Sequence, residues 1–233
     1  MISVCLATCN GERFVAEQIA SILQSPRVGE LVVSDDGSVD RTRDIVLGFK
    51  DPRVRLLDGP HAGVVRNFEF LLTQARGDRI FLADQDDVWL PEKVEVMTAA
   101  LDSADLVVSD CVVVDGALAV MQPSFFAARA SGPGLLRNLT KNSFLGCCIA
   151  IDRRLLARAL PFPSGIPMHD WWLGLVAQQF GRVAFIAKPL MLYRRHGANA
   201  SSTSERSATG LWTRLRWRAR LVRALLLRAL RVG

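Results

Sequence analysis

Short apolar runs alternate with stretches in which apolar residues recur at helical spacing over most of the chain. The first run is followed by Val15, Ile19, Ile22 and Leu23, which lie on one face of a helix. Further strand-like runs are again separated by helical stretches, and this alternation predicts an α/β domain with a largely parallel sheet covered by helices. The predicted strands of this half are 2–7, 31–34, 54–57, 80–83 and 106–109.

The second half of the chain is less regular. The runs 112–114 and 117–120 flank Asp115 and Gly116, which predicts a hairpin with a two-residue turn. The composition of residues 197–210, rich in serine, threonine and glycine, is typical of a linker. We therefore expect a body, 1–196, the linker 197–210 and a terminal helix, 211–233. The other elements predicted in this half are a buried strand at 144–151, a helix at 170–180, and strands at 183–186 and 190–193.

The net charge of +6 is concentrated at the end of the chain. From Arg206 onward there are only arginines among the charged residues, while the rest of the chain is slightly acidic, which excludes a globally basic nucleic-acid-binding surface. Arginines interleaved with leucine and tryptophan predict an amphipathic helix on an anionic membrane surface, where each arginine contributes roughly 1 kcal/mol. A helix packed on the body or on a partner, and an RNA-binding arm, are the alternatives; without a stacking platform elsewhere, we expect no nucleic-acid partner.

Cysteine usage and the start of the chain indicate the compartment. The five cysteines are odd in number and show no CxxC spacing, which favours reduced thiols, and Cys147 and Cys148 are expected to be small buried strand residues. The first residues form a strand pattern rather than a secretion signal, and no window approaches about 20 uncharged apolar residues. We therefore expect a cytoplasmic protein, held peripherally at the inner face of the membrane.

Two acidic clusters directly follow predicted strands, at the carboxyl ends where open α/β sheets bind ligands. Asp35 and Asp36 come after the second strand, where an ordinary turn is the alternative. Asp84, Asp86 and Asp87 come after the fourth, and three carboxylates within one turn repel each other unless a cation or solvent compensates. The second cluster therefore predicts a site for a divalent cation such as Mg²⁺ or Mn²⁺, in preference to a solvated turn.

A third carboxylate, Asp170, stands at the start of a predicted helix beside His169, Trp171 and Trp172. It is either a helix N-terminal carboxylate with two core tryptophans, or a general base among aromatic walls that contact an acceptor. Desolvation among such side chains would raise its proton affinity.

Taken together, these motifs resemble the family 2 glycosyltransferases of the GT-A fold, and bacterial rhamnosyltransferase-like members in particular. The likeness follows the family's order from the first strand to His196. The resemblance implies a Rossmann-like mixed central sheet flanked by helices. The motifs are Thr8-Cys9-Asn10-Gly11-Glu12, Ser34-Asp35-Asp36-Gly37-Ser38 with Asp40 and Thr42, Arg66-Asn67, Gly77-Asp78, Asp84–Asp87 with Trp89, Gly146-Cys147, His169-Asp170-Trp171-Trp172 and Tyr193-Arg194-Arg195-His196.

The resemblance also implies a donor, a UDP- or dTDP-sugar. Asp36, with Asp35, would accept a hydrogen bond from the imide nitrogen of the base, and Asp84 and Asp86 match the family's Asp-X-Asp motif. The ligands of the metal would come from Asp86, Asp87 and His196. Residues expected to border the nucleotide, the donor sugar or the diphosphate are Thr8, Asn10, Glu12, Arg66 and Asn67.

On the acceptor side, Asp170 matches the family's catalytic base. Many members have Glu-Asp at this point, whereas this chain has His169-Asp170, so we expect His169 to orient the acceptor instead. The expected reaction is single displacement with inversion, with rhamnose favoured, onto a glycan or lipid-linked acceptor in the assembly of surface polysaccharide such as lipopolysaccharide. A sugar-phosphate nucleotidyltransferase and a non-catalytic polysaccharide-binding module on the membrane are the alternatives.

Overall fold

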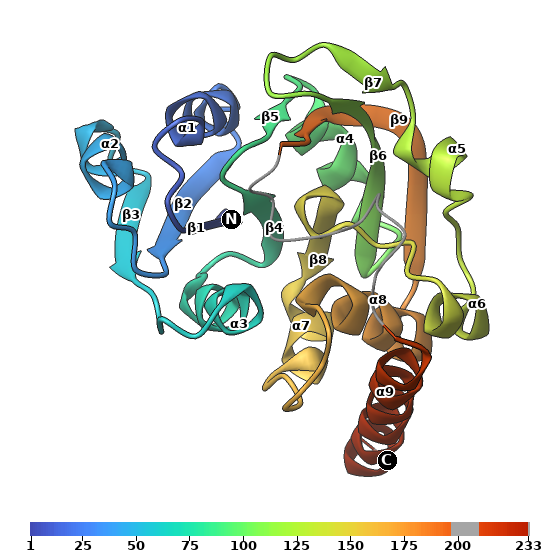
Figure 1. The fold of residues 1–233 in the computed structure, drawn as a ribbon. Helices are drawn as coiled ribbons and strands as arrows, with labels where there is room; N and C mark the ends of the chain where they lie inside the picture. Colours follow the sequence, from blue (N-terminus) through green and yellow to red (C-terminus); the bar gives the residue numbers. More distant parts are fainter. Residues whose placement is uncertain (197–209, 233) are drawn as a thin grey trace.

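The computed structural model describes residues 1–196 and 210–232. The expected α/β fold is confirmed: one mixed sheet lies between two layers of helices (Figure 1). The predicted linker falls outside the described residues apart from Gly210. In chain order the elements are β1 (Ile2–Thr8), α1 (Val15–Leu23), β2 (Val28–Asp35), α2 (Thr42–Gly48), β3 (Val54–Asp58), α3 (Val64–Gln74), β4 (Arg79–Asp84), β5 (Val88–Trp89), α4 (Lys93–Ala100), β6 (Leu106–Val114), β7 (Val120–Gln122), α5 (Phe125–Arg129), α6 (Leu135–Thr140), the 3₁₀ turn η1 (Gly146–Cys148), β8 (Ile149–Asp152), α7 (Arg153–Ala159), α8 (His169–Phe180), β9 (Val183–Arg194) and α9 (Leu211–Val232).

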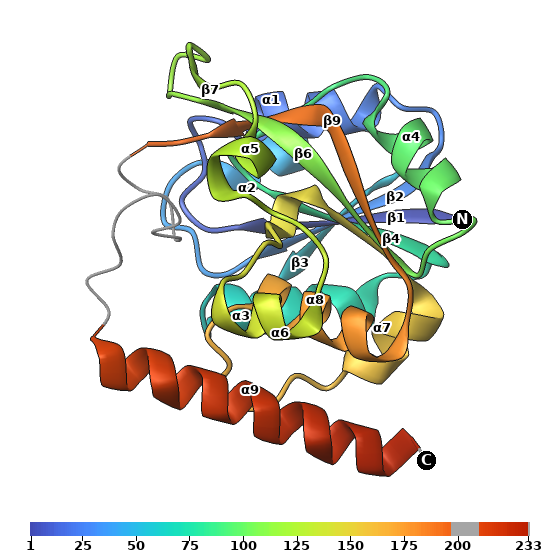
Figure 2. The ribbon, with the colours of Figure 1, turned by 90° about the vertical axis from the view of Figure 1, so that its right-hand side faces the viewer.

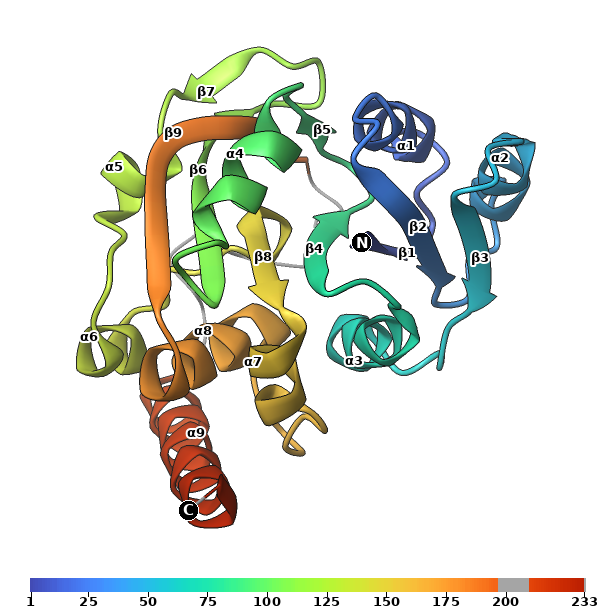
Figure 3. The ribbon, with the colours of Figure 1, turned by 180° about the vertical axis from the view of Figure 1, so that it is seen from behind.

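The sheet has the order β3-β2-β1-β4-β8-β6-β9-β5, and β7 pairs with β6. The pairs among β3, β2, β1 and β4 are parallel, while β8 runs antiparallel to both β4 and β6. Figure 3 shows this order from behind. Helices α1, α2 and α4 cover one face, and α3, α7 and α8 cover the other (Figure 2). The central strands are apolar without alternation because both of their faces are buried.

Three predicted elements differ from the observed ones. β6 is one continuous strand through Val114, and residues 115–119 form a wider turn in which Leu118 has φ +67° and Asp115 Oδ1 accepts from two backbone N–H groups. The run 117–120 is therefore mostly turn. Only the end of the predicted strand 144–151 is extended, because Gly146–Cys148 form η1. The two late strands are one strand, β9, whose register with β6 shifts near Pro189.

The basic tail forms helix α9, as expected, and α9 packs across the layer that contains α6 and α8 (Figure 2). Leu221 and Leu225 are buried in this contact, and each contributes about 1.5–3 kcal/mol of hydrophobic stabilisation. Arg228 donates to the carbonyl oxygens of Leu160 and Pro161, both at 2.6 Å. Within residues 1–196 and 210–232, no helix combines the length and apolar character needed to cross a membrane.

Candidate active site

A cavity of about 330 Å³ opens where the carboxyl ends of β1, β2 and β4 meet the start of α8. Carboxylates from three distant parts of the chain line it. Asp36 follows β2, Asp84 ends β4 with Asp86 just beyond, and Asp170 lies in the first turn of α8. The topology therefore brings together the three acidic clusters that the sequence places far apart.

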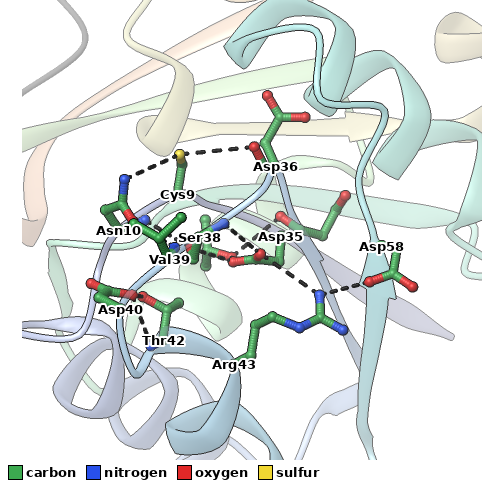
Figure 4. Close-up of polar contacts among 12 residues, drawn as sticks. Cys9, Asn10, Asp35, Asp36, Ser38, Val39, Asp40, Thr42, Arg43 and Asp58 are labelled. Carbon is green, nitrogen blue, oxygen red and sulfur yellow. Dashed lines mark hydrogen bonds and ion pairs between the residues drawn. The ribbon is translucent and has the colours of Figure 1, made fainter.

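Side-chain hydrogen bonds join the turn after β1 to the turn after β2 (Figure 4). Asn10, with φ +51°, accepts the backbone N–H of Val39 at 2.9 Å, and its own N–H donates to Ser38 Oγ at 2.8 Å. Asp35 is buried and accepts from Thr8 Oγ1 and from the backbone N–H of Ser38. Asn10 and Asp35 were predicted to contact the nucleotide. In the structure they brace the loops that form this end of the cavity.

Asp36 is half-buried and lines the cavity. Its carboxylate accepts the backbone N–H of Gly63 at 2.8 Å and that of Ala62 at 3.3 Å, which ties the end of β2 to the start of α3. Thr8 and Asn67 line the same wall. Asn67 is buried and donates to the carbonyl oxygen of Ser34, so it also fixes β2 against α3.

Two further residues expected near the donor, Glu12 and Arg66, lie outside the cavity lining, as Asn10 and Asp35 do. Glu12 Oε2 accepts the backbone N–H of Arg41 at 3.1 Å and forms an exposed ion pair with its side chain. Arg66 forms an ion pair with Glu69 and donates to the carbonyl oxygen of Phe162 at 3.4 Å.

The acidic cluster after β4 has strongly perturbed proton affinities. Burial raises the pKa of Asp84 to about 8, with further contributions from the charges of Asp86 and Asp170. Burial also raises the pKa of Asp87 well above its usual range, and Asp86 and Asp84 add to the shift. Within the described part of the chain, Asp87 Oδ2 has no hydrogen-bond partner. Such a cluster holds more negative charge than its own neighbours compensate, as a cation site does.

Asp86, Asp87 and His196, which were expected to hold a metal, fall into two groups, and Cys147, which was not expected, joins the second. Asp86 Oδ2 lies 2.8 Å from His196 Nε2, whereas ligand atoms of Asp84, Asp87 and Cys147 lie within 4.8 Å of one another. Burial raises the pKa of Cys147 well above its usual range, so the thiol stays protonated and is a poor ligand for a hard cation. The carboxylate oxygens fit Mg²⁺ or Mn²⁺, which prefer oxygen ligands.

Asp170 is buried and lines the same cavity. Burial raises its pKa to about 7, although its Oδ1 accepts from the backbone N–H of Trp171 and from Asn142 Nδ2. A carboxylate with this pKa can take and release a proton near neutral pH.

His169 beside it is almost fully buried and stacks on Phe68 with ring centroids 3.9 Å apart. Burial lowers the pKa of His169 to about 3, which keeps the imidazole neutral.

The two tryptophans after Asp170 do not line the cavity. Trp172 is fully buried, and its Nε1 donates to the carbonyl oxygen of Ala159. Its expected contact with an acceptor is therefore wrong, because the indole belongs to the core between α7 and α8. Trp171 is half-buried and donates to the carbonyl oxygen of Asn138, which holds α6 against α8.

Several cavity residues were not predicted from the sequence. Gln85 exchanges two hydrogen bonds with the backbone of Cys9, and it packs so closely on Gly11 that a Cβ there would lie 2.3 Å from Gln85 Oε1. The sequence motif flagged Gly11 but gave no sign of its partner. The sequence motifs also included the lining residues Cys9, Gly146 and Tyr193 without giving them a role. The lining residues outside the motifs are Ala7, Gly63, Val64, Asn142, Leu145 and Met168.

Comparison with known proteins gives a consistent set of similarities. The family model described as Glycosyl transferase family 2 matches residues 3–159. The chain is 27% identical over 179 residues to an Escherichia coli protein named UDP-Glc:alpha-D-GlcNAc-diphosphoundecaprenol beta-1,3-glucosyltransferase WfgD, covering 75% of this chain and 68% of that protein. It is 27% identical over 238 residues to the dTDP-rhamnosyl transferase RfbG of Shigella flexneri, covering 91% of this chain and 80% of that protein.

Solved structures show the same fold. Staphylococcus aureus TarS 1–349 in complex with UDP-GlcNAc superposes with a TM-score of 0.72 at 20% identity, covering 95% of this chain and 66% of that one. The mannosyltransferase PcManGT of Pyrobaculum calidifontis, in complex with GDP-Man and Mn²⁺, gives a TM-score of 0.61 at 19% identity, covering 100% of this chain and 64% of that one. The chain thus spans slightly less than two thirds of each of these two solved chains.

Proposed function

The chain belongs to glycosyl transferase family 2, and from this membership we propose that it is an inverting glycosyltransferase that moves a sugar from a nucleotide-diphosphate donor to an acceptor hydroxyl. The observation that carries the proposal is the convergence of Asp36, Asp84, Asp86 and Asp170 on one cavity. A donor with a base at one end and an anomeric carbon at the other needs polar groups at both ends of a single site.

In the proposed reaction Asp170 accepts the proton of the acceptor hydroxyl as that oxygen attacks the anomeric carbon. Its burial supports this role, because a pKa of about 7 leaves the carboxylate basic enough to take the proton and ionised enough to be available. Asn142, which donates to Asp170 Oδ1 at 3.4 Å, orients the carboxylate. Attack on the face opposite the leaving diphosphate inverts the configuration of the sugar.

The acidic cluster supports dependence on a divalent metal. Asp84, Asp86 and Asp87 would hold the cation, with His196 beside Asp86, and a bound cation would supply positive charge to the departing diphosphate. At the other end, Asp36 and Thr8 would contact the nucleoside, within loops that Asp35 and Asn10 brace.

Rhamnose from a dTDP donor is the proposed sugar, ahead of glucose or galactose from UDP donors. The similarity to the protein named dTDP-rhamnosyl transferase extends over 91% of the chain. Val64, Leu145 and Met168 add apolar surface to the cavity, which suits the methyl group of a 6-deoxy sugar better than a hydroxymethyl group.

The proposed acceptor is a glycan or lipid-linked glycan of a bacterial surface polysaccharide, reached at the inner face of the cytoplasmic membrane. The outer side of α9 supports this location. Trp212, Leu215, Val222, Leu226 and Leu230 are exposed there. Arginines alternate with them, and α9 contains no acidic residue. A helix of this composition binds the interface of an anionic membrane.

A panel of nucleotide sugars tests the proposal. We expect Mn²⁺ together with dTDP-rhamnose, and with dTDP alone, to raise the melting temperature of the full chain, and we expect slow release of dTDP from the sugar donor. The same donor with EDTA, and GDP-mannose with Mn²⁺, are the controls. A chain whose melting temperature responds to none of the nucleotides in the presence of metal would be a binding or scaffolding module instead.

A further inference from the structure

The imidazole of His169 is a buried polar group without a partner at the wall of the cavity. Only 2% of the residue is exposed, and neither Nδ1 nor Nε2 has a hydrogen-bond partner among residues 1–196 and 210–232. Buried polar atoms in folded proteins are almost always paired, since an unpaired group has lost its water without compensation. The side chain nevertheless lines the cavity, so a bound molecule can supply the missing hydrogen bonds.

The ring is held in place by Phe68 and Gly146. Phe68 stacks on it at 3.9 Å between centroids with an interplanar angle of 22°. Gly146 lies at the Nε2 end of the ring, where a Cβ would stand only 2.7 Å from His169 Nε2. The ring is therefore fixed between α3 and η1 before any ligand arrives, which is the arrangement of a recognition group rather than of a mobile surface side chain.

The charge state of the ring limits the kind of ligand. A fully buried imidazole stays neutral, because burial lowers the pKa of His169 to about 3. A neutral imidazole offers one N–H donor and one acceptor nitrogen, which match a hydroxyl group. A phosphate or carboxylate would be recognised by a cation, as in charge-assisted pairs.

The position of the ring indicates which sugar it meets. Phe68 is the neighbour of Asn67 on α3, and the start of α3 at Gly63 is hydrogen-bonded to Asp36. This wall runs from the nucleotide end of the cavity to His169. Asp170, by contrast, is bonded to Asn142 from the segment before η1. Gly146 adjoins both residues, while His169 also packs on α3 through Phe68.

We infer that His169 hydrogen-bonds a hydroxyl group of the sugar being transferred, while Asp170 acts on the acceptor. This inference rests on the proposed function and replaces the acceptor-orienting role expected for His169 from the sequence. The chain would then recognise the donor sugar with a neutral group that is fixed before the sugar binds.

The test compares His169→Phe, which keeps the aromatic stack on Phe68 and removes both nitrogens, with His169→Gln, which keeps one donor and one acceptor. We expect His169→Phe to lower kcat/KM for the nucleotide sugar at least about tenfold, since hydrogen bonds to a neutral ligand are lost. The loss should be the same in acceptor-independent donor hydrolysis and in transfer. His169→Gln should recover part of it, while the KM of the acceptor stays within about twofold.

Affinity for the nucleoside diphosphate alone serves as the internal control, because an unchanged Kd in both variants shows that the nucleotide half remains folded. A raised acceptor KM with normal donor hydrolysis would overturn the inference in favour of acceptor recognition. Unchanged donor and acceptor kinetics in His169→Phe would overturn it entirely. If the unmodified chain binds no nucleotide sugar, the proposed function itself is wrong. If it binds one and the variants have the same kinetics as the unmodified chain, only the proposed role of His169 is wrong.

Discussion

At the scale of single residues, the environment of Asp170 differs from that of other aspartates at helix starts. Asp152 caps α7 by accepting the backbone N–H of Arg154 at 2.8 Å. Asp170 also stands in the first turn of a helix, but burial beside the cavity raises its pKa to about 7. The same residue type in the same local position thus has a structural role in one place and the properties of a base in the other.

Asp170→Asn should therefore lower kcat by about 10²–10⁴, the contribution that a positioned general base typically makes. The amide keeps the size of the side chain and can still accept from the N–H of Trp171, so the affinity for the nucleoside diphosphate should change little. Steady-state transfer kinetics and calorimetric nucleotide binding measure the two quantities.

Asp152→Asn is the matched control, because it makes the same substitution at a helix start outside the cavity lining and should retain full activity. The pH profile provides a second readout. The base must be ionised, so the kcat/KM of the unmodified chain should fall as pH drops below about 7, and this limb should be missing from the residual activity of Asp170→Asn. Asp170→Asn turnover within a few fold of normal would remove the residue from the chemistry.

At the scale of elements, the parallel half of the sheet was predictable because its signals are local. Strand-like runs such as 80–83 are short, apolar and followed by turn residues, and β4 extends this run by one residue at each end. Where the prediction was wrong, a tertiary contact decided the structure. β6 stays continuous past Ser109 because β9 pairs with it along its length, and Gly146–Cys148 leave the extended conformation where η1 packs against His169.

For helix α9, the sequence predicted the helix but not the face that packs on the body. Its composition predicted an amphipathic helix, and the structure adds that the face with Leu221 and Leu225 is already used for packing on the body. The opposite face has a shallow groove lined by Trp212, Leu215 and Arg216, and apolar side chains continue along it. Packing on the body and contact with a membrane, which were alternatives for the sequence, are therefore compatible because they use different faces.

The double variant Val222→Glu/Leu226→Glu should bind vesicles containing anionic phospholipid much more weakly than the unmodified chain. Both side chains are exposed, 39% and 60%, so the fold should be retained, while two charges enter the apolar stripe and oppose insertion. Flotation at low and high salt measures the binding, which should weaken with salt because the arginines contribute electrostatically.

Leu47→Glu is the control, since Leu47 is 65% exposed on α2, away from α9, and should leave flotation unchanged. If the double variant floats as well as the unmodified chain, the outer face of α9 does not bind lipid. If the unmodified chain is a dimer that the double variant dissociates, the partner of this face is a second copy of the chain.

At the scale of the whole molecule, the sequence supplied the components of the site but not their arrangement. The acidic clusters could be recognised from the sequence alone, because like charges within a short turn repel each other. Cys147 and His169 owe their present properties to contacts with residues far along the chain. The protonated thiol of Cys147 stands beside Asp84 and Asp87 only because β8 pairs with β4, and His169 is neutral only because Phe68 and Gly146 enclose it.

Without these long-range contacts the carboxylates would lie in three separate turns. We therefore expect the stability of the fold to depend on the protonation state of the acidic cluster. The pKa values of Asp84 and Asp170 are raised to about 8 and about 7, and that of Asp87 is raised well above its usual range. The folded chain therefore keeps protons that the unfolded chain releases above a pH of about 4. The associated stability is present at low pH and is lost as pH rises toward 8.

We accordingly expect the melting temperature of the metal-free chain to decrease from pH 6 to pH 8 by a few degrees, since about 1 kcal/mol corresponds to roughly 2–4 °C for a chain of this size. Mn²⁺ should raise the melting temperature more at pH 8 than at pH 6, because a cation binds the deprotonated carboxylates.

Asp84→Asn should stabilise the metal-free chain at pH 8 and remove most of the response to Mn²⁺. Asp102→Asn, which changes an exposed carboxylate paired with Arg79, should leave that response intact. A shift with Mn²⁺ that is equal at both pH values, or that persists in Asp84→Asn, would place cation binding outside the cluster after β4.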